Sequence, residues 1–326
     1  MKRQAVAVAH PNVALSKYWG KRAGEGNFPA VPSLSVTLAG LSTRTRVTWR
    51  DDARRDHVVL DGRELADADA ARVRTLLDRV RSETGLRDAA EVESMNDFPT
   101  ASGLASSASG FAALAFAAVR AAGIDWDAAR VSDLARQSSA SAARSVFGGF
   151  VELEVGASSA RAVAPPDHLP LVVLVCVTTE AAKAVGSTDG MRVTMERSPY
   201  AQAWLEEAPK MHARLREALL ARDLDRVGEL AEASALAMHA SAIAAGVVYW
   251  SGATLEAVRA VRDLRRAGTA AFATIDAGPH VKVLTRPEDA VRVRAAMTAT
   301  PGVLRVLDAR PGDGARIVPG TENEGP

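Results

Sequence analysis

The stretch NDFPTASGLASSASG, at positions 96–110, has the residue types of a loop that holds phosphate. It contains four serines, two glycines and three alanines, between an expected strand and an expected helix. Small residues let the backbone turn sharply and come close to a ligand, and a helix N-terminus directs free N–H groups and the positive end of its dipole at an anion. The hydroxyls of Ser106, Ser107 and Ser109 could bind phosphate oxygens or reach a magnesium ion.

Composition alone leaves other interpretations of this stretch open. It could be a disordered low-complexity patch, or Ser106 could cap the helix while the alanines allow close packing, with no ligand at all. The pattern is neither a Walker phosphate loop nor a dinucleotide fingerprint, because the chain has no Gly-Lys-Ser/Thr and no G-x-G-x-x-G. A decision therefore needs residues from elsewhere in the chain.

The overall composition excludes several classes of protein. With 326 residues, 48% of them hydrophobic, the chain can bury a large core in one large domain or two medium ones. Its 40 Lys and Arg residues balance 39 Asp and Glu residues, so it lacks the positive field of a nucleic-acid-binding protein, and any anion site must be local. The single cysteine, Cys176, excludes an internal disulfide and fits a reducing cytoplasm. No apolar run approaches ~18 residues, and Pro11, Asn12 and Lys17 interrupt the N-terminal one; we expect neither a membrane span nor a secretory signal.

The hydrophobic patterns predict strands and helices in mixed order, typical of an α+β fold. In the first half, strands are expected at 4–9, 33–38, 43–50, 57–62, 150–155 and around Cys176, and helices over 67–84, up to Gly123 and from a capping Ser132. In the second half, we expect a first helix that is capped by Ser198, has Pro199 in its first turn and ends at 221. Further helices are expected over 223–245, over 254–268 and from Pro287. Strands are expected on both sides of 276–280 and at 303–309, with a disordered tail after Pro311. We therefore expect two lobes, residues 1–184 and 185–326, with a cleft between them.

The stretch at 96–115 closely resembles the phosphate-binding motif of the GHMP kinase superfamily, in the form that diphosphomevalonate decarboxylases carry. Three further segments are similar to the same family and follow in its order: AHPNVALSKYWGKR (9–22) with PSLSVTL (32–38), SSASAARSVFGGFVE (138–152) and ATIDAGPHVKVL (273–284). Agreement spread from residue 9 to residue 284 is far more specific than one loop. The resemblance therefore favours the phosphate-loop interpretation.

The resemblance implies both a fold and a reaction. The expected fold is the two-lobed GHMP kinase fold, with a first lobe like ribosomal protein S5, a ferredoxin-like second lobe and the active site in the cleft. The expected reaction uses ATP to phosphorylate the 3-hydroxyl of mevalonate 5-diphosphate. Loss of that phosphate and of carbon dioxide then yields isopentenyl diphosphate, in the mevalonate route to isoprenoids. The family commonly forms homodimers. No His/Cys/Asp/Glu cluster has metal-ligand spacing, so Mg²⁺ should arrive with ATP, held by phosphates and serine hydroxyls.

Positions that match the family motifs carry expected catalytic roles. Asp276 matches the catalytic aspartate that orients the 3-hydroxyl or accepts its proton, although the residue alone would suit the start of a turn. Arg144 matches the arginine whose planar fork binds the substrate carboxylate, and Asn12 is similar to the asparagine that supports it. Lys17 is a candidate to compensate phosphate charge, although its apolar neighbours equally suit a lysine that reaches the surface.

The remaining matches divide between the two ligands. The resemblance implies that the diphosphate end of the substrate meets Tyr18, Gly20, Lys21, Ser139, Ser141, Ser187 and Thr188. It implies that the ATP phosphates meet Ser102, Gly103, Leu104, Ala105, Ser106 and Ser107. Trp19 is a further candidate for substrate contact, but a buried core position suits its ring better. Arg72, on the helix after an Asp-Gly turn, is a candidate to face the substrate.

The sequence also departs from the family pattern at three places. The segment 100–103 reads TASG where two alanines usually precede the glycine, His280 replaces the usual asparagine, and the segment GKRAGEG lacks the acidic residue that commonly follows GKR. Neither Asp276 nor Arg144 is affected. Three alternatives therefore stay open: a decarboxylase of mevalonate 5-phosphate, a mevalonate 3-kinase without decarboxylation, and a non-catalytic binding homologue, which would be expected to lack Asp276 or Arg144.

Overall fold

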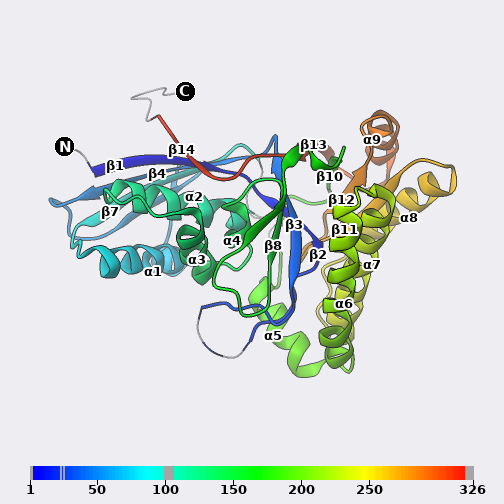
Figure 1. Ribbon diagram of the computed structural model, residues 1–326, viewed down its shortest axis with the longest axis horizontal. Coiled ribbons are helices and arrows are strands. Elements are labelled where there is room, and N and C mark those ends of the chain that lie inside the picture. The colour runs from blue at the N-terminus through cyan, green and yellow to red at the C-terminus, as the bar shows by residue number, and fades with distance from the viewer. Residues whose placement is uncertain (1–2, 23, 25, 99–105, 182, 320–326) are drawn as a thin grey trace.

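The structure is a computed structural model that describes residues 3–22, 24, 26–98, 106–181 and 183–319. Within these ranges the chain forms two β-sheets with helices packed on their faces (Figure 1). The first sheet has the order β14-β1-β4-β7-β5-β6, and its neighbours are antiparallel except for the parallel pair β5 and β7. Its strands are β1 (Arg3–Ala9), β4 (Thr43–Arg50), β5 (His57–Leu60), β6 (Arg63–Glu64), β7 (Ala89–Asn96) and β14 (Arg316–Val318).

One face of the first sheet is covered by helices, as the alternation in β4 predicts. Val47 and Trp49 point inward and are buried, whereas Arg44 and Arg46 are exposed on the other face. The covering helices are α1 (Asp67–Thr84), α2 (Ser106–Ala121) and α3 (Ala128–Ser138). Helix α2 is rich in alanine and nearly all of it is buried, because small side chains let it lie close to β1 and β4. Its N-terminus is thereby fixed beside the site described below.

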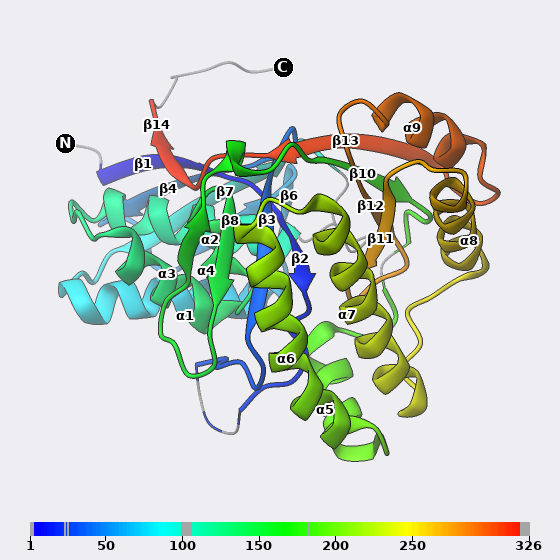
Figure 2. The same ribbon diagram turned by 45° about the vertical axis from the view of Figure 1, so that its right-hand side comes forward.

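The second sheet joins the two halves of the sequence. Its order is β11-β12-β10-β13-β3-β8-β9, and β2 pairs with β3 off this path. Strand β13 bridges the halves, because it pairs with β10 on one side and with β3 on the other (Figure 2). The strands are β2 (Asn12–Ser16), β3 (Ser33–Ala39), β8 (Phe150–Leu153), β9 (Arg161–Ala164), β10 (Val172–Val177), β11 (Ala271–Ile275), β12 (Val281–Thr285) and β13 (Arg305–Pro311).

Helices pack on both faces of the β10, β11 and β12 region, which explains why these strands are apolar without alternation. Alternate residues of β10 contribute to separate cores, with Val173 and Val175 packing toward α6 and α7 and Leu174 and Cys176 packing toward α8 and α9. The helices of this half are α5 (Ser187–Arg197), α6 (Ala201–Leu220), α7 (Leu224–Ala244), α8 (Gly252–Arg266) and α9 (Ala290–Ala299). Two short elements complete the described fold, α4 (Ala142–Ser145) and the 3₁₀ helix η1 (Pro166–His168).

Three predicted helix starts are wrong, and one of them is that of α9, which begins at Ala290 rather than at Pro287. Helix α3 is capped by Asp127, whose side chain accepts from Arg130 N–H, so Ser132 lies inside the helix. The Ser132 hydroxyl instead donates to the Ala143 carbonyl at 2.9 Å and accepts from the Ala160 N–H at 3.0 Å, which ties α3 to α4 and to the segment before β9. Ser198 follows the end of α5, a helix that we did not predict, and α6 begins only at Ala201.

The predicted disordered tail is also wrong where the structure describes it. Residues 316–318 form β14, which pairs antiparallel with β1 through Val318 and Val6. The short apolar run there satisfies an edge of β1 that would otherwise be open. The helix predicted over 67–84 is confirmed at both ends, and Gly85 stops it in the left-handed conformation, with φ of 73°.

Candidate active site

A cavity of about 780 Å³ is lined by segments from both halves of the chain. Its wall is built from β2 and the segment after it, from α1, from the N-terminus of α2, and from segments 137–144, 183–191 and 276–277. Apart from Gly20 and Ser109, the described residues that sequence reasoning placed in the site line this wall: Asn12, Lys17, Tyr18, Trp19, Lys21, Arg72, Ser106, Ser107, Ser139, Ser141, Arg144, Ser187, Thr188 and Asp276. The prediction that the Ser109 hydroxyl binds phosphate is wrong, because it is fully buried and lies 2.6 Å from Thr43 Oγ1. Ser102, Gly103, Leu104 and Ala105 lie outside the described residues.

Asp276 lies directly after β11, and its carboxylate faces the cavity with 24% of the side chain exposed. Lys17 Nζ donates to its Oδ1 at 2.6 Å, and Lys282 Nζ lies 3.1 Å from its Oδ2. Burial by itself would raise the pKa of Asp276, but the charges and hydrogen bonds of the two lysines outweigh it and hold the pKa well below the usual range. Asp276 is therefore an ionised carboxylate at any physiological pH.

Lys17 is buried, so the alternative of a lysine that reaches the surface is wrong. Its side chain is 2% exposed, and Nζ also donates to the Ala14 carbonyl at 2.8 Å. Burial lowers the pKa of Lys17 to about 8, opposed by Asp276 and assisted by Lys282 and Arg144. Lys17 thus belongs to the ionic centre of the cavity.

Arg144 is held by neutral groups. Nε donates to Ser35 Oγ at 3.0 Å, Nη1 to Ser33 Oγ at 2.7 Å and Nη2 to Asn12 Oδ1 at 3.4 Å. Asn12 is fixed in turn, because its Nδ2 donates to the Ser141 carbonyl and to Ser145 Oγ. Within the described ranges no carboxylate lies at ion-pair distance from Arg144, and burial lowers its pKa to about 10. A rigid guanidinium with neutral partners is prepared to bind an anion.

Lys21 is positioned by the loop that follows it. Its Nζ donates to Asn27 Oδ1 at 2.7 Å and to Thr188 Oγ1 at 2.9 Å. Asn27 has a φ of 56°, and its Nδ2 donates to the Gln137 carbonyl at 2.8 Å. Gly20, just before Lys21, has a φ of 107°, which favours glycine at this turn.

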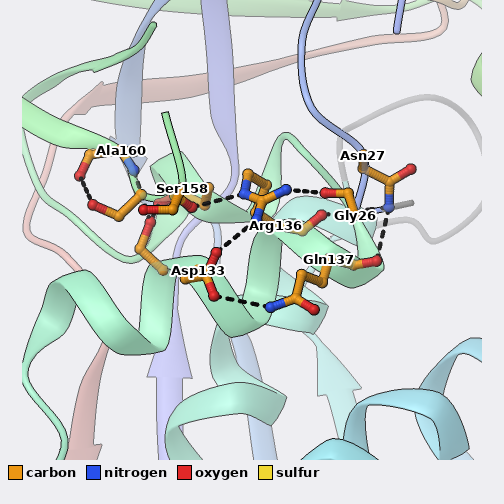
Figure 3. A network of polar contacts seen from close by, with 10 residues as sticks. Gly26, Asn27, Asp133, Arg136, Gln137, Ser158 and Ala160 are labelled. Atoms are coloured by element: carbon orange, nitrogen blue, oxygen red, sulfur yellow. Dashed lines mark hydrogen bonds and ion pairs between the residues drawn. The ribbon is translucent and has the colours of Figure 1, made fainter. Parts of the chain in front are cut away.

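Arg136 fixes the same loop to helix α3 (Figure 3). It donates to the carbonyls of Gly26 and Ser158, pairs with Asp133, and stacks on the Phe28 ring with 3.8 Å between the guanidinium carbon and the ring centre. These contacts tie the loop that follows Lys21 to helix α3 and to the segment before β9.

Sequence reasoning missed four residues of this site. Lys183 lines the cavity, donates to Ser187 Oγ at 2.8 Å, and burial lowers its pKa. Asp189 also lines the cavity, Asn27 orients Lys21, and Lys282 contacts Asp276. A lysine between two valines of a strand, as in HVKVL, is the one local signal that pointed to a buried charge.

Aromatic and basic residues complete the wall. Trp19 is 1% exposed and packs edge-on against Tyr249 with 6.0 Å between ring centres, which confirms the core interpretation of its ring. The Tyr18 hydroxyl is buried without a hydrogen-bond partner among the described residues, and burial raises its pKa. Arg72 lies over the Phe111 ring at 4.8 Å. Ser139 and Ser141 share a hydrogen bond of 3.1 Å.

The charge and shape of the cavity suit phosphorylated ligands. Among the described lining residues, Lys17, Lys21, Arg72, Arg144 and Lys183 outnumber the carboxylates Asp189 and Asp276. A second hollow of about 240 Å³ adjoins the N-terminus of α2. It shares Arg72, Ser106 and Ser107 with the first cavity. Its other walls are mostly apolar and come from strands β5 and β7 and helices α1 and α2. This arrangement can hold an anionic group beside a helix N-terminus and a flat apolar group next to it.

Comparison with known proteins decides the family. Residues 9–164 match the diphosphomevalonate decarboxylase-like N-terminal domain, and residues 173–304 match the mevalonate 5-diphosphate decarboxylase C-terminal domain. The chain belongs to the diphosphomevalonate decarboxylase family. Among curated relatives of this family, the phosphomevalonate decarboxylase of Haloferax volcanii is 35% identical, covering 90% of this chain and 92% of that protein. The human diphosphomevalonate decarboxylase is 33% identical, covering 88% and 78%.

Solved structures of the family have the same fold. The Staphylococcus aureus mevalonate diphosphate decarboxylase superposes with a TM-score of 0.92 at 33% identity, covering 98% of this chain and 99% of that one. The Enterococcus faecalis enzyme superposes with a TM-score of 0.89 at 35% identity, with the same coverage. The predicted α+β GHMP kinase fold is confirmed, and the described residues build it with two sheets.

The described residues lack two further features. No helix there is long and apolar enough to cross a membrane. No group of three or more His, Cys, Asp and Glu side chains there is placed to hold a metal ion.

Proposed function

We propose that this protein catalyses the ATP-dependent decarboxylation of mevalonate 5-diphosphate to isopentenyl diphosphate. The observation that carries the proposal is the pairing of an ionised carboxylate, Asp276, with a guanidinium fixed by neutral groups, Arg144, in one cationic cavity. The first group suits a hydroxyl that must be directed at a phosphate, and the second suits a carboxylate that must leave. Neither would be needed by a protein that only binds phosphates.

In this proposal the substrate lies with its carboxylate on Arg144 and its 3-hydroxyl on Asp276. The diphosphate meets the donors Tyr18, Lys21, Ser139, Ser141, Ser187 and Thr188. Hydrogen bonds already join Lys21 to Thr188 and Ser139 to Ser141, so these donors are oriented before a ligand arrives. Their number suits two phosphates better than one, which favours the 5-diphosphate over the 5-phosphate.

The ATP phosphates are assigned to the N-terminus of α2, with Ser106, Ser107 and Lys183 beside them. The adjoining 240 Å³ hollow offers apolar walls for the base. A structural neighbour with a TM-score of 0.91 is described as MDDEF in complex with MVAPP, AMPPCP and magnesium, which supports both nucleotide and Mg²⁺ here. Serine hydroxyls are suitable oxygen ligands for Mg²⁺ carried on phosphates, and the ion would neutralise phosphate charge.

Asp276 orients the hydroxyl more than it removes the proton. The two lysines lower its pKa so far that it is a weak base. Phosphoryl transfer through a loose transition state needs the proton to leave only late, when the oxygen has become acidic, and the Asp276 carboxylate that binds the hydroxyl accepts it then. The 3-oxygen then forms a bond to the γ-phosphorus while the bond to the ADP oxygen breaks.

Arg144 directs the second stage. The C–O bond to the new phosphate breaks, and the electron pair of the C–C bond to the carboxylate forms the double bond, releasing phosphate and carbon dioxide. The three hydrogen bonds from Arg144 to Ser33, Ser35 and Asn12 fix the guanidinium, and so the plane of the bound carboxylate. A fixed plane keeps the breaking C–C bond aligned with the departing phosphate.

The reaction is tested with purified protein, ATP, Mg²⁺ and, separately, mevalonate, its 5-phosphate and its 5-diphosphate. ADP and carbon dioxide are followed together. We expect equal amounts of both with the 5-diphosphate and far less with the others. Release of ADP without carbon dioxide would show that the protein is a mevalonate 3-kinase. Release of carbon dioxide mainly from the 5-phosphate would show that its substrate is mevalonate 5-phosphate, as the name of the Haloferax relative indicates for that protein.

Three further expectations are part of this proposal. We infer that the protein works in the cytoplasm, as its buried free Cys176 suits, and as a homodimer. We also propose that residues 1–184 form one lobe and residues 185–326 the other. Light scattering of the purified chain tests the dimer, and limited proteolysis tests the division.

A further inference from the structure

Lys282 is a buried lysine that the motif match assigned no role. It is the second residue of β12, between Val281 and Val283, and its side chain is 2% exposed. Its neighbours across the sheet are Thr274 of β11 and Val175 of β10. A lysine inside a sheet that is covered on both faces loses its hydration, so the fold tolerates it only with a compensating partner.

The partner is Asp276. Lys282 Nζ lies 3.1 Å from Asp276 Oδ2, on the oxygen that Lys17 does not bind. The other ionisable groups around this centre are cationic or neutral: Lys17 after β2, Arg144 of α4, Lys183 after β10, and His239 of α7. Within the described part of the chain, Asp276 is therefore the carboxylate that compensates Lys282.

Lys282 is absent from the cavity wall, whereas Asp276 and Lys17 form part of it. It therefore lies behind the carboxylate and acts on a ligand only through Asp276. With Lys17 on Oδ1 and Lys282 on Oδ2, the carboxylate is held at both oxygens and cannot rotate about its last bond without breaking an ion pair. The face left toward the cavity is the face that the 3-hydroxyl would meet.

We propose that Lys282 is a positioning residue, which locks the orientation and the ionised state of Asp276 from behind the active site. The expected effect of Lys282 on catalysis rests on the proposed function, whereas the ion pair between Lys282 and Asp276 does not. The ion pair exists without any substrate, so it can be tested without one.

The first test is a double-mutant cycle on thermal stability, in buffer without phosphate, sulfate or nucleotide. The four proteins are the wild type, Lys282→Met, Asp276→Asn and the double variant. Methionine has a similar volume and no charge, so it suits the apolar surroundings. In Asp276→Asn the Lys282 ammonium becomes a buried charge without its partner, and we expect Lys282→Met to raise the midpoint by several degrees in that background.

In the wild-type background we expect Lys282→Met to lower the midpoint or leave it unchanged, because an ion pair is lost together with a desolvated charge. The sign of its effect thus depends on Asp276. If Lys282 only fills space, the substitution shifts both midpoints equally, and that result would overturn the assignment. Lys210→Met, at an exposed lysine of α6 that pairs with Glu207, is the control and should give the same small shift in both backgrounds.

The second test uses the proposed reaction. We expect Lys282→Met to lower kcat by about tenfold or more, since a misaligned carboxylate misplaces the hydroxyl. KM for ATP and for mevalonate 5-diphosphate should stay within about twofold, because Lys282 touches neither cavity. A raised KM with unchanged kcat would contradict a positioning role. If the wild type releases no carbon dioxide from any of the three mevalonate compounds, the proposed function fails, while the stability cycle still decides the role of Lys282.

Discussion

Lys17 and Asp276 are 259 residues apart in the sequence, and their side chains meet at 2.6 Å. Lys17 follows β2, which packs on helix α7, and Asp276 follows β11, which packs on the same helix. The Ala14 carbonyl adds to this junction, because it accepts hydrogen bonds from Lys17 Nζ and from Thr274 Oγ1. The ionic centre of the site is thus also the seam that joins the N-terminal strands to the C-terminal ones.

Asp276→Ala should separate chemistry from nucleotide binding. The variant loses the group that orients the hydroxyl, so we expect turnover to fall ~10²-fold or more, with nucleotide affinity changed only a few fold. Turnover is measured by ADP and carbon dioxide release, and affinity by calorimetric titration of a non-hydrolysable ATP analogue. Asp263→Ala, at an exposed aspartate of α8, is the matched control. Near-normal turnover in Asp276→Ala would remove this carboxylate from the mechanism.

Arg144→Lys should be costly although it keeps the charge. A lysine cannot make the three hydrogen bonds that hold the guanidinium plane, nor a two-bond contact with a carboxylate. We expect kcat/KM for the mevalonate substrate to fall about 10- to 100-fold, the cost of one charged hydrogen bond. Arg130→Lys, on the exposed side of α3, should leave kcat/KM unchanged. Equal kinetics in the two variants would show that the substrate carboxylate binds elsewhere.

The parts of the fold with strong local signals were predictable from sequence. The helix over 67–84 has a regular apolar stripe and a glycine that stops it, and both ends were predicted correctly. At the start of α3, by contrast, Asp127 and Ser132 are both polar residues suited to a cap. Local spacing could not decide between them, because the choice depends on Ser132 bonding to Ala143 and Ala160.

The site shows the same limit. Matching motifs identified Arg144 and Asp276, but not the partners that fix them. Ser33 is 111 residues from Arg144, and Lys282 reaches Asp276 only because β12 pairs with β11 in one register. Contacts of this kind are properties of sheet pairing, and no periodicity within one segment encodes them.

Activity should fall at alkaline pH because of Lys17. Its pKa is lowered to about 8, so it is charged below that pH and becomes neutral above it. Loss of the ammonium removes one of the two cations on Asp276, and kcat/KM should decline with a midpoint near pH 8. Bound phosphates stabilise the ammonium, so kcat should decline at a higher pH than kcat/KM. In Lys17→Arg the charge persists, and the decline near pH 8 should disappear. A flat wild-type profile up to pH 10 would contradict this role.

Asn27→Ala should weaken substrate binding without slowing the chemical step. Asn27 holds Lys21 on one side and the Gln137 carbonyl on the other. Without Asn27, Lys21 keeps its hydrogen bond to Thr188 but loses one of its two partners, and we expect KM for the mevalonate substrate to rise about 3- to 10-fold with kcat nearly unchanged. Gln202→Ala, on the exposed face of α6, is a suitable control. Asn96 is not, because its side chain pairs with Asp61. A fall in kcat with unchanged KM would place Lys21 nearer the reacting atoms than proposed.

Acid should destabilise the protein through two buried histidines. Burial lowers the pKa of His239 to about 4 and that of His280 to about 3, whereas both titrate near 6.5 in the unfolded chain. Between pH 6.5 and 4 these histidines are therefore protonated in the unfolded state but not in the folded state. The free energy of unfolding decreases as the pH falls through this window. Each histidine lowers the free energy of unfolding by up to about 1.4 kcal/mol for each pH unit of acidification in this window.

His280→Asn tests this contribution at the position where the family usually carries asparagine. The Asn side-chain oxygen can accept the Thr178 N–H that His280 Nδ1 now accepts at 3.1 Å, so the variant should fold and keep its turnover. We expect its thermal midpoint to drop less than that of the wild type between pH 7 and pH 4.5. His57→Asn, at a half-exposed histidine of β5, is the control and should follow the wild type. If His280→Asn and the wild type lose stability in parallel, the acid sensitivity comes from His239 and the carboxylates rather than from the His280 ring.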